Sequence, residues 1–476
     1  MGSRVCVLQN IGCSKSGPSL FENSLIGFLI GLNITKGWDM ADSTERFLKD
    51  IKDIFSLTAE NARGVMVRFH REMELGLSGE KSSLKMLPSF VHRPKGTEKG
   101  TFLAIDLGGT NIRVLAIRLL GDGVIEPVAL SRFTISDEVM TGTGDMFFDF
   151  IAGCIEVFFR ENNITKQPFN LGFTFSFPVV QSSVNSGLLI SWTKGFSVSG
   201  VEGKDVVALL NDALIRNRMG FIHISALIND TVGTIAAGSY SNPLCDMGVI
   251  LGTGTNACYP EKIDKIGKYS GSDALDEMII NIEWGGFDKL ERNRYDEALE
   301  VNSQNPGEQR LEKMVSGMYL GEIARLIIID MIEKGLIISR EIKSLFMLPY
   351  SLTTKHLSLF ASGIDIFKAA GVDNLSDKDI RCIREIANLV STRSARIAAT
   401  AIASVVTWMD HGLQYSHHIA IDGSLFEKYP GYKDIMESMF HEILGDPSEK
   451  IRLVPTHDGS GTGAAIIAAL ESLKKR

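Results

Sequence analysis

The sequence has little cysteine, no excess of positive charge and no recognisable metal-binding motif, and each of these absences excludes a class of protein. Its six cysteines among 476 residues show no C-x-x-C pairing, and its nine histidines form no HExxH motif. We therefore expect free thiols in a reducing compartment and no structural metal. The formal net charge of −8 argues against a general binder of nucleic acid or of anionic membranes. An anionic substrate stays compatible with it, because backbone amides and one lysine can hold a phosphate.

The first forty residues differ in character from the rest. The apolar run at 24–34 has about eleven residues, too few to span a bilayer, and no signal-peptide pattern surrounds it. We expect a loosely packed extension, and the capping sequence after Met40 suggests the hypothesis that the working protein starts there. The remainder is long enough for two or more lobes. Helical spacing runs from Thr44 to about Gly76, and a proline-pinned linker at 86–94 marks a lobe boundary.

A glycine turn follows the apolar strand that begins at Thr101. The strand leads into Asp106-Leu-Gly-Gly-Thr-Asn111, and an apolar run after it predicts a returning strand. Glycines let the backbone turn tightly and bring bare N–H groups against a phosphate, and Asp106 is placed to hold Mg²⁺ through water. The alternative is a plain β-hairpin turn, for which Asp, Gly and Asn are the usual residues.

A second turn of the same kind follows the strand that begins at Met247. The sequence Gly252-Thr-Gly-Thr-Asn-Ala257 matches the G-x-G-x-x-A pattern of dinucleotide-binding proteins, which needs a helix directly after the glycines. A β-type run stopped by Pro260 follows instead, so we reject NAD and predict a second phosphate-holding hairpin. Two such hairpins indicate a duplicated core that holds a nucleotide between its halves. Further glycine turns at 422–424 and 458–463 strengthen this interpretation.

The stretch 171–196 combines a strand end with polar and basic residues. Pro178 cannot donate a ladder hydrogen bond, so the strand ends there and leaves Ser176 and Phe177 at its carboxyl end, where α/β proteins bind ligands. A second apolar stretch ends at Thr193-Lys194. A hydroxyl, an aromatic ring and a lone lysine predict a small polar ligand that faces an anionic group.

Three acidic residues stand out by their positions. Asp230 lies between an apolar strand and a helical stretch, so it is either an ordinary N-cap or a carboxylate able to accept a hydroxyl proton. Glu283 follows a strand. Glu312 lies near the start of a predicted long helix that continues through 312–333, where it could simply complement the helix dipole.

With these pieces placed, the sequence resembles the hexokinase family of actin-like sugar-kinase ATPases. The resemblance runs from about residue 45 to the C-terminus and rests on LGFTFSFP with GLLISWTKGF, AIDLGGTNIRV, LINDTVGT, ILGTGTNACYP, NIEWGGFD, NPGEQRLEKMVSGMYLGE, STRSARIAA and DGSGTGAA. It implies a two-lobed α/β fold of the actin-like or ribonuclease H-like ATPase type, with a duplicated mixed β-sheet core and an interlobe cleft. The implied lobes are a large one, 41–94 with 230–458, and a small one, 95–229 with 459–476, after the extension over 1–40.

The resemblance also implies an activity and its residues. The activity is ATP-dependent phosphorylation of a hexose on its 6-hydroxyl, the first step of glycolysis, with ATP and Mg²⁺, in a cytoplasmic monomer or homodimer. D-Glucose is the expected hexose, and mannose, fructose and glucosamine are further candidates. The implied catalytic residues are Asp230, the base, and Lys194, which stabilises charge. The implied sugar contacts are Ser176, Phe177, Pro178, Thr193, Lys194, Asn229, Asp230, Asn256, Glu283 and Glu312. The implied nucleotide-side residues are Asp106 (with Mg²⁺, through water), Leu107, Gly108, Gly109, Thr110, Asn111, Arg113, Gly252, Thr253, Gly254, Gly317 and Ser424.

The departures from the family pattern are small. Ile112 stands where the family often has Phe, and Met318 stands where some members carry an ATP-contacting Lys. The segment 365–376 matches poorly, so no adenine contact is assigned. A non-catalytic sugar sensor of the same fold is one alternative, but such proteins tend to lose the base, a phosphate glycine or the lysine, which are all present. A related kinase of glycerol or acetate is another, and the 171–196 signature argues against it.

Overall fold

The computed structural model describes residues 43–109, 111–193, 195–271, 276–337, 340–364, 367 and 375–474. The chain divides into two compact units, 1–50 and 51–476. Of the first unit the structure describes residues 43–50, which belong to a helix over 43–55. The predicted extension over 1–40 and the hypothesis about Met40 lie outside the described residues.

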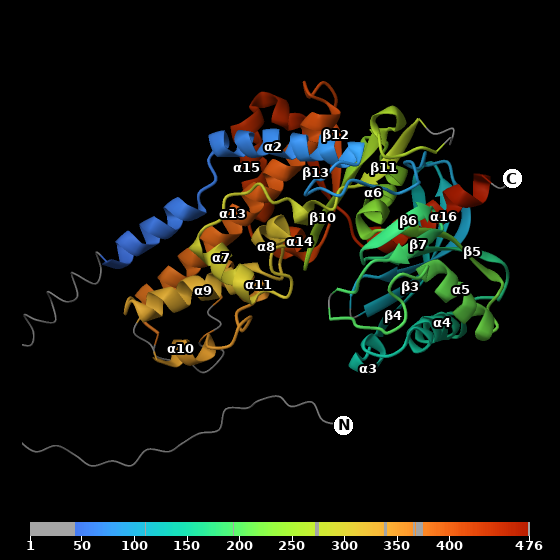
Figure 1. Ribbon diagram of the computed structural model, residues 1–476, viewed down its shortest axis with the longest axis horizontal. Helices are drawn as coiled ribbons and strands as arrows, with labels where there is room; N and C mark the ends of the chain where they lie inside the picture. The colour runs from blue at the N-terminus through green and yellow to red at the C-terminus, as the bar shows by residue number, and fades with distance from the viewer. Residues whose placement is uncertain are drawn as a thin grey trace, which may run out of the picture. The chain divides into compact units, whose positions relative to one another are not determined.

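Within the second unit, the described strands form two mixed sheets (Figure 1). The two sheets repeat one strand order. The five-stranded sheet runs β4-β3-β2-β5-β8, and the six-stranded sheet runs β1-β11-β10-β9-β12-β13. In each, three consecutive strands form an antiparallel meander, and two later strands extend the sheet in parallel from the first strand of that meander. This repeat confirms the predicted duplicated mixed-sheet core, whereas the lobe boundaries stay a prediction.

The strands have the following bounds. The five-stranded sheet consists of β2 (Lys99–Leu107), β3 (Asn111–Gly121), β4 (Val124–Thr134), β5 (Phe169–Phe175) and β8 (Ile222–Ile228). The six-stranded sheet consists of β1 (Leu87–Pro88), β9 (Cys245–Leu251), β10 (Thr255–Lys262), β11 (Glu277–Asn281), β12 (His417–Asp422) and β13 (Ile451–Pro455). A separate hairpin pairs β6 (Val179–Ser183) with β7 (Ser186–Leu189).

Helices connect and cover these strands. The α-helices are α2 (Ala59–Ser78), α3 (Asp137–Met140), α4 (Gly144–Glu161), α5 (Val206–Arg216), α6 (Asp230–Ser241), α7 (Arg294–Asn302), α8 (Arg310–Val315), α9 (Leu320–Glu333), α10 (Arg340–Leu345), α11 (Thr354–Ala361), α13 (Asp377–Met409), α14 (Ser424–Lys428), α15 (Tyr432–Leu444) and α16 (Gly459–Lys474). Short 3₁₀ helices are η1 (Ile263–Lys265), η2 (Trp284–Gly286) and η3 (Asp446–Lys450).

Helices pack on both faces of the five-stranded sheet and bury its apolar side chains. Leu103 and Ile105 of β2 pack with α4 and α5 on one face, and Phe102 and Ala104 pack with α6 and α16 on the other. Because side chains alternate along a strand, Asp106 comes out on the face of Ala104. The sheet therefore directs this carboxylate towards the start of α16.

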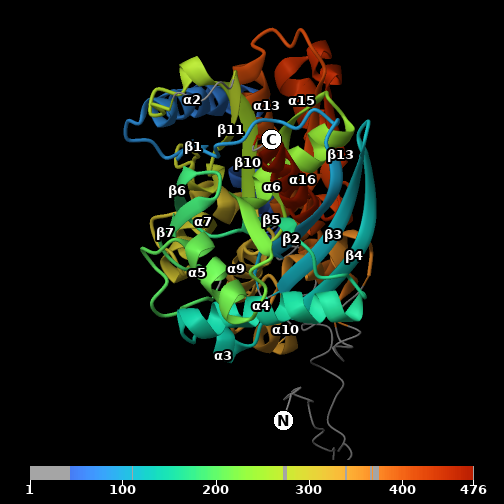
Figure 2. The same ribbon diagram turned by 90° about the vertical axis from the view of Figure 1, so that its right-hand side faces the viewer.

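Helices α6 and α16 lie against each other in the layer between the two sheets (Figure 2). Helix α16 packs on β2, β5 and β8, and α6 packs on β9, β10 and β12. A Cβ added at Gly463 would lie 1.8 Å from the carbonyl oxygen of Gly233, and one added at Gly233 would lie 2.4 Å from that of Ser460. Glycine at these two positions is therefore what allows the helices to approach so closely.

The helical region predicted from Thr44 to Gly76 is interrupted and ends later than expected. Thr58 caps a new helix, α2, by accepting a hydrogen bond of 3.2 Å from the backbone N–H of Asn61. The C-cap is Gly79, whose φ of 84° requires the left-handed region that glycine tolerates. The prediction of Gly76 as the cap was therefore wrong by three residues.

The long helix predicted through 312–333 is also broken, between α8 and α9. The backbone N–H groups of Gly317 and Met318 donate to the carbonyl oxygens of Gly252 (2.8 Å) and Thr253 (3.1 Å) instead of to their own helix. The carbonyl oxygens of a turn far away in the sequence thus accept the hydrogen bonds that these N–H groups would have made within a continuous helix.

Among the described residues, one helix, α13, has the length and the apolar composition needed to cross a membrane. Of the 18-residue stretch of this helix that meets the hydropathy criterion, 83% is buried inside the protein. Its Arg393 donates to both carboxylate oxygens of Asp296 in α7, at 2.7 and 2.8 Å, and both side chains are almost fully buried. The burial and the ion pair are those of a core helix.

Candidate active site

The first glycine turn, which contains Gly108 and Gly109, follows the carboxyl end of β2 and leads to β3. Leu107 is fully buried at the end of β2, and Asn111 opens β3. A Cβ added at Gly109 would meet no atom within 4 Å, so the space beside this part of the turn is open. The open space leaves room for a phosphate to approach the backbone N–H groups. Gly108 is exposed in the same turn, and Thr110 lies outside the described residues.

The second glycine turn, 252–254, occupies the equivalent place between β9 and β10. The N–H of Gly252 donates to the carbonyl oxygen of Gly254 at 3.0 Å, which closes the turn, and Thr253 is exposed at its tip. A strand follows the glycines, as predicted, so the turn lacks the helix that a dinucleotide fingerprint requires.

Two more of the predicted nucleotide-side residues lie next to this second turn. Gly317 donates its N–H to Gly252, as described above, and its own carbonyl accepts a hydrogen bond of 2.6 Å from Thr354. The Cα of Gly423 lies 3.6 Å from the place where a Cβ on Gly252 would stand, and the exposed Ser424 follows it as the first residue of α14. The fold therefore brings two separate segments, around Gly317 and Gly423, next to this hairpin.

Asp106 is buried within a network of hydrogen bonds and ion pairs. Its side chain, 3% exposed, accepts hydrogen bonds from Ser460 Oγ (2.8 Å) and from the guanidinium of Arg113. Arg113 also pairs with Asp458 and donates to Ser460 Oγ at 3.0 Å. Burial lowers the pKa of Arg113, but the two carboxylates outweigh it and leave the pKa above its ordinary value. Asp106 Oδ2 is thus committed to protein partners, which fits a metal contact made through water.

Asp422, at the end of β12, is a second acid near this network and is half-buried. Burial raises its pKa to about 6, against the opposing effects of Arg113 and of the Gly459 N–H, which donates to Asp422 Oδ2 at 3.0 Å. The hydrogen bond ties β12 to the start of α16.

Asn229 and Asp230 lie where β8 ends and α6 begins. Asn229 is the N-cap, since its Oδ1 accepts hydrogen bonds from the Thr231 N–H (3.0 Å) and hydroxyl (2.7 Å). Asp230 is the first helical residue and is half-buried. The N-cap interpretation of Asp230 was therefore wrong, because its neighbour fills that position.

A cluster of amides and carboxylates stands beside this helix start. Asn256 Nδ2 lies 2.9 Å from Asn281 Oδ1, 3.0 Å from Glu283 Oε1 and 3.4 Å from Asn229 Oδ1. Asn281 Nδ2 in turn donates to Glu283 Oε1 at 2.8 Å. Such a mixture of donors and acceptors suits a ligand whose hydroxyls do both.

Glu283 reaches this cluster through a strained backbone. Its φ of 56° lies in the left-handed region, where a residue with a side chain costs of order 1–3 kcal/mol. The hydrogen bonds from Asn256 and Asn281 hold the carboxylate in place. Strain of this kind concentrates where structure serves a ligand.

Glu312 faces the second glycine turn from α8. Its Oε2 accepts a hydrogen bond of 3.0 Å from the N–H of Thr255. The hydroxyl of Thr255 accepts another of 3.0 Å from the indole of Trp284, the residue after Glu283. The predicted sugar contacts at 256, 283 and 312 therefore belong to one connected site.

Within the stretch 171–196 that was predicted to face a ligand, the segment 176–193, called the recognition loop below, leaves the five-stranded sheet next to the first turn. Ser176 is buried, and its N–H donates to the carbonyl of Leu107 at 3.1 Å. The ring of Phe177 packs in an aromatic cluster, with its centroid 4.9 Å from Trp192 and 5.0 Å from Phe196. Pro178 is half-buried and Thr193 is exposed, whereas Lys194 lies outside the described residues.

Four residues of these networks were missed by sequence reasoning. They are Asn281, Asp422, Asp458 and Ser460. Asn281 opens the NIEWGGFD segment, and the other three lie in glycine turns that the sequence had singled out. Their side chains act on residues distant in sequence, so local pattern gave no role to any of them.

A resident metal cluster is not part of this arrangement. Among the described residues, no group of three or more His, Cys, Asp or Glu side chains converges as a metal site. What the described residues offer is two glycine turns that suit phosphates, and an amide and carboxylate cluster beside Asp230 that suits a polyhydroxylated ligand. Transfer of a phosphoryl group to a hydroxyl is the chemistry that needs both.

Comparison with known proteins gives consistent matches. Two family models described as Hexokinase match residues 47–240 and 246–470. The chain is 38% identical to Hexokinase-1 of Saccharomyces cerevisiae, over 90% of this chain and 94% of that protein, and 41% identical to Hexokinase-1 of Nicotiana tabacum, over 84% and 86%. A solved structure of a hexokinase from Schistosoma mansoni complexed with glucose matches with a TM-score of 0.81 and 34% identity, over 90% of this chain and 99% of that one.

Proposed function

The chain belongs to the hexokinase family and is an ATP-dependent hexose kinase of glycolysis, and we propose that Asp230 is its catalytic base. The observation that carries the proposal is the hydrogen-bonded chain from Glu283 through Asn256 to Asn229, which ends at the residue before Asp230. A hexose held by that chain would have a hydroxyl beside the carboxylate at the start of α6.

The proposed chemistry is a single displacement. The oxygen of the 6-hydroxyl attacks the γ-phosphorus of ATP, the bond from that phosphorus to the leaving ADP oxygen breaks, and Asp230 takes the hydroxyl proton. A positioned general base contributes roughly 10²–10⁴ in rate. The rest of the acceleration comes from position and from charge stabilisation, because phosphoryl transfer leaves the protein little covalent work.

We propose D-glucose as the preferred hexose, held by Asn229, Asn256, Glu283 and Glu312. Each sugar hydroxyl both donates and accepts, and these side chains supply both kinds of partner. A missing or inverted hydroxyl would leave a buried polar group unpaired, at about 1–3 kcal/mol each. Initial rates with glucose, mannose, fructose and glucosamine at several concentrations test the order of preference.

The glycine turns at 108–110 and 252–254 are proposed to bind the phosphates of ATP, with Gly317 and Ser424 on the nucleotide side. Mg²⁺ is normally held by phosphates, water and one or two carboxylates, and the donors here fit that pattern. We propose Asp106 as the carboxylate that contacts it through water. Bound Mg²⁺ would supply charge neutralisation at the phosphates.

The recognition loop completes the proposal. Ser176, Phe177, Pro178 and Thr193 are proposed to contact the sugar. The ring of Phe177 also packs in the aromatic cluster that supports the loop. Lys194 is proposed to neutralise the transferring phosphoryl group, on the strength of its place in the family motif.

The variant Asp230→Ala tests the role of the base. We expect it to lose nearly all turnover and to retain hexose binding, followed by intrinsic tryptophan fluorescence, to which Trp284 beside the site contributes. Asp434→Ala is the matched control, because it removes an acidic side chain from the first turn of another helix, α15, and should keep wild-type turnover. An Asp230→Ala enzyme that keeps more than about a tenth of wild-type kcat would show that another group takes the proton.

A cytoplasmic location is also proposed. Cys154 and Cys245 are buried free thiols, and burial raises the pKa of each to about 12. Thiols kept protonated and unpaired fit a reducing compartment. Imaging of the full chain fused to a fluorescent protein checks this, and sedimentation tests whether it is a monomer or a homodimer.

A further inference from the structure

Helix α8, which carries Glu312, is too short to fix its own position. It has six residues, and its N-cap, Gln309, makes no capping hydrogen bond with its side chain and has a left-handed φ of 54°. Isolated helices shorter than about 12–15 residues are marginal in water. The neighbours of α8 therefore decide where the carboxylate of Glu312 lies.

Lys313, the residue after Glu312, makes buried polar contacts on a different face of α8. Lys313 is 3% exposed, and its Nζ lies 3.0 Å from Glu300 Oε1 in α7 and 2.8 Å from the carbonyl oxygen of Asn305. Glu300 also accepts a hydrogen bond from the N–H of Gly307. Burial raises the pKa of Glu300, but Gly307 and Lys313 outweigh it and keep the pKa below its ordinary value. One carboxylate thus joins α7, the loop over 303–309 and α8.

The two consecutive side chains hold α8 from two directions. Successive residues of a helix point about 100° apart, so Glu312 meets the N–H of Thr255 at 3.0 Å while Lys313 faces α7. A rotation of α8 that releases Lys313 would turn Glu312 away from the second glycine turn.

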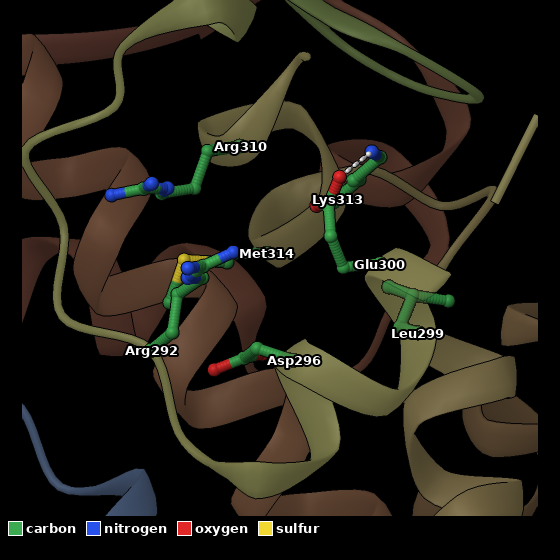
Figure 3. Close-up of a pocket in the computed structure, with 7 residues that line it drawn as sticks. All are labelled: Arg292, Asp296, Leu299, Glu300, Arg310, Lys313 and Met314. Atoms are coloured by element: carbon green, nitrogen blue, oxygen red, sulfur yellow. Dashed lines mark hydrogen bonds and ion pairs between the residues drawn. The ribbon is translucent and has the colours of Figure 1, made fainter. Parts of the chain in front are cut away.

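A small cavity lies beside the ion pair. Figure 3 shows Lys313 and Glu300 at its wall, with Arg292 and Met314 close by. Its volume is about 10 Å³, at the lower limit for one water molecule, so it is no ligand site. Buried ion pairs commonly add little net stability. We therefore attribute the Lys313–Glu300 pair to the positioning of α8 and not to stability.

We propose that Lys313 is a positioning residue of the hexose site, which acts through Glu300 to set the place of Glu312. The proposal rests on the proposed role of Glu312 as a sugar contact. It predicts that loss of the ion pair weakens hexose binding and leaves ATP binding alone.

The test compares Lys313→Met, which keeps the length of the side chain but removes its charge, with the wild-type enzyme. We expect the KM for hexose to rise about fivefold or more while the KM for ATP stays within about twofold. Lys313→Arg, which restores a cation, should recover much of the loss. Arg325→Met is the matched control: it breaks another buried pair, with Glu322 at 2.6 Å in α9, and should cost stability without a change in hexose KM.

A fourth variant, Glu312→Gln, separates the two levels of the proposal. If it leaves the hexose KM unchanged, the sugar-contact role of Glu312 is wrong and the inference falls with it. If it raises that KM while Lys313→Met does not, the inference alone is overturned. Should Lys313→Met fail to fold, Glu300→Gln replaces it, and an unchanged hexose dissociation constant from tryptophan fluorescence would equally overturn the inference.

Discussion

Replacing Gly463 by alanine should force α6 and α16 apart. The added Cβ would lie 1.8 Å from the carbonyl oxygen of Gly233, whereas ordinary contacts begin at 3.4 Å, so the helices must separate by about 1.6 Å. Overpacking of this kind typically costs about 1–3 kcal/mol, and the helix preference of alanine returns only about 0.5–1 kcal/mol. Because Asp230 starts α6 and Ser460 of α16 binds Asp106, we also expect kcat to fall by about 10².

Gly153→Ala is the matched control for this variant. Gly153 lies inside α4, and a Cβ there would meet no atom within 4 Å. Its replacement should raise the free energy of unfolding by about 0.5–1 kcal/mol and leave turnover unchanged. Urea denaturation and a coupled assay of product measure both effects. A Gly463→Ala enzyme with the wild-type unfolding midpoint and wild-type kcat would refute the argument that the close crossing positions the site.

Three further predictions concern buried or half-buried polar residues. Asn281→Ala removes a donor to Glu283 and should raise the KM for hexose about tenfold without changing the KM for ATP in steady-state kinetics; an equal rise in both would contradict it. Asp422, whose pKa of about 6 lies above its ordinary 3.8, makes the native state lose stability as the pH rises from about 4 to 6. Asp422→Asn should therefore flatten the curve of unfolding free energy against pH in this window, and an unchanged slope would argue against it. Arg393→Met leaves Asp296 buried without its cation and should cost about 3–5 kcal/mol in urea denaturation, part of which Asp296→Asn should restore; no loss would contradict the pairing.

The sequence predicted best those features that local chemistry determines. Pro178 and the glycines at 252 and 254 end strands or turn the chain by their own backbone preferences, and the hairpins stand where they were expected. The sequence did not predict the break between α8 and α9, because the N–H groups of Gly317 and Met318 donate to carbonyl oxygens of residues 252 and 253, far away in the sequence. Tertiary contacts there override a continuous helical pattern.

The candidate site shows the same division. The local pattern allowed Asp230 to be either a helix N-cap or a carboxylate that accepts a proton. The structure shows that Asn229 is the N-cap. The roles of Asn256 and Glu312 came from the family resemblance and not from spacing. Asn281 escaped both, because its importance lies in the contacts that join it to Asn256 on the neighbouring strand and to Glu283.

The hydrogen bonds from Gly317 and Met318 to the turn at 252–253 have a thermodynamic consequence. They fasten the segment after Glu312 to the hairpin proposed to hold phosphate, so a ligand bound at either place helps to order the other. Hexose and nucleotide should then bind with a shared coupling free energy, and by linkage each must alter the affinity of the other by the same factor. In such an enzyme, the amount of nucleotide present would itself help to decide how much sugar is bound.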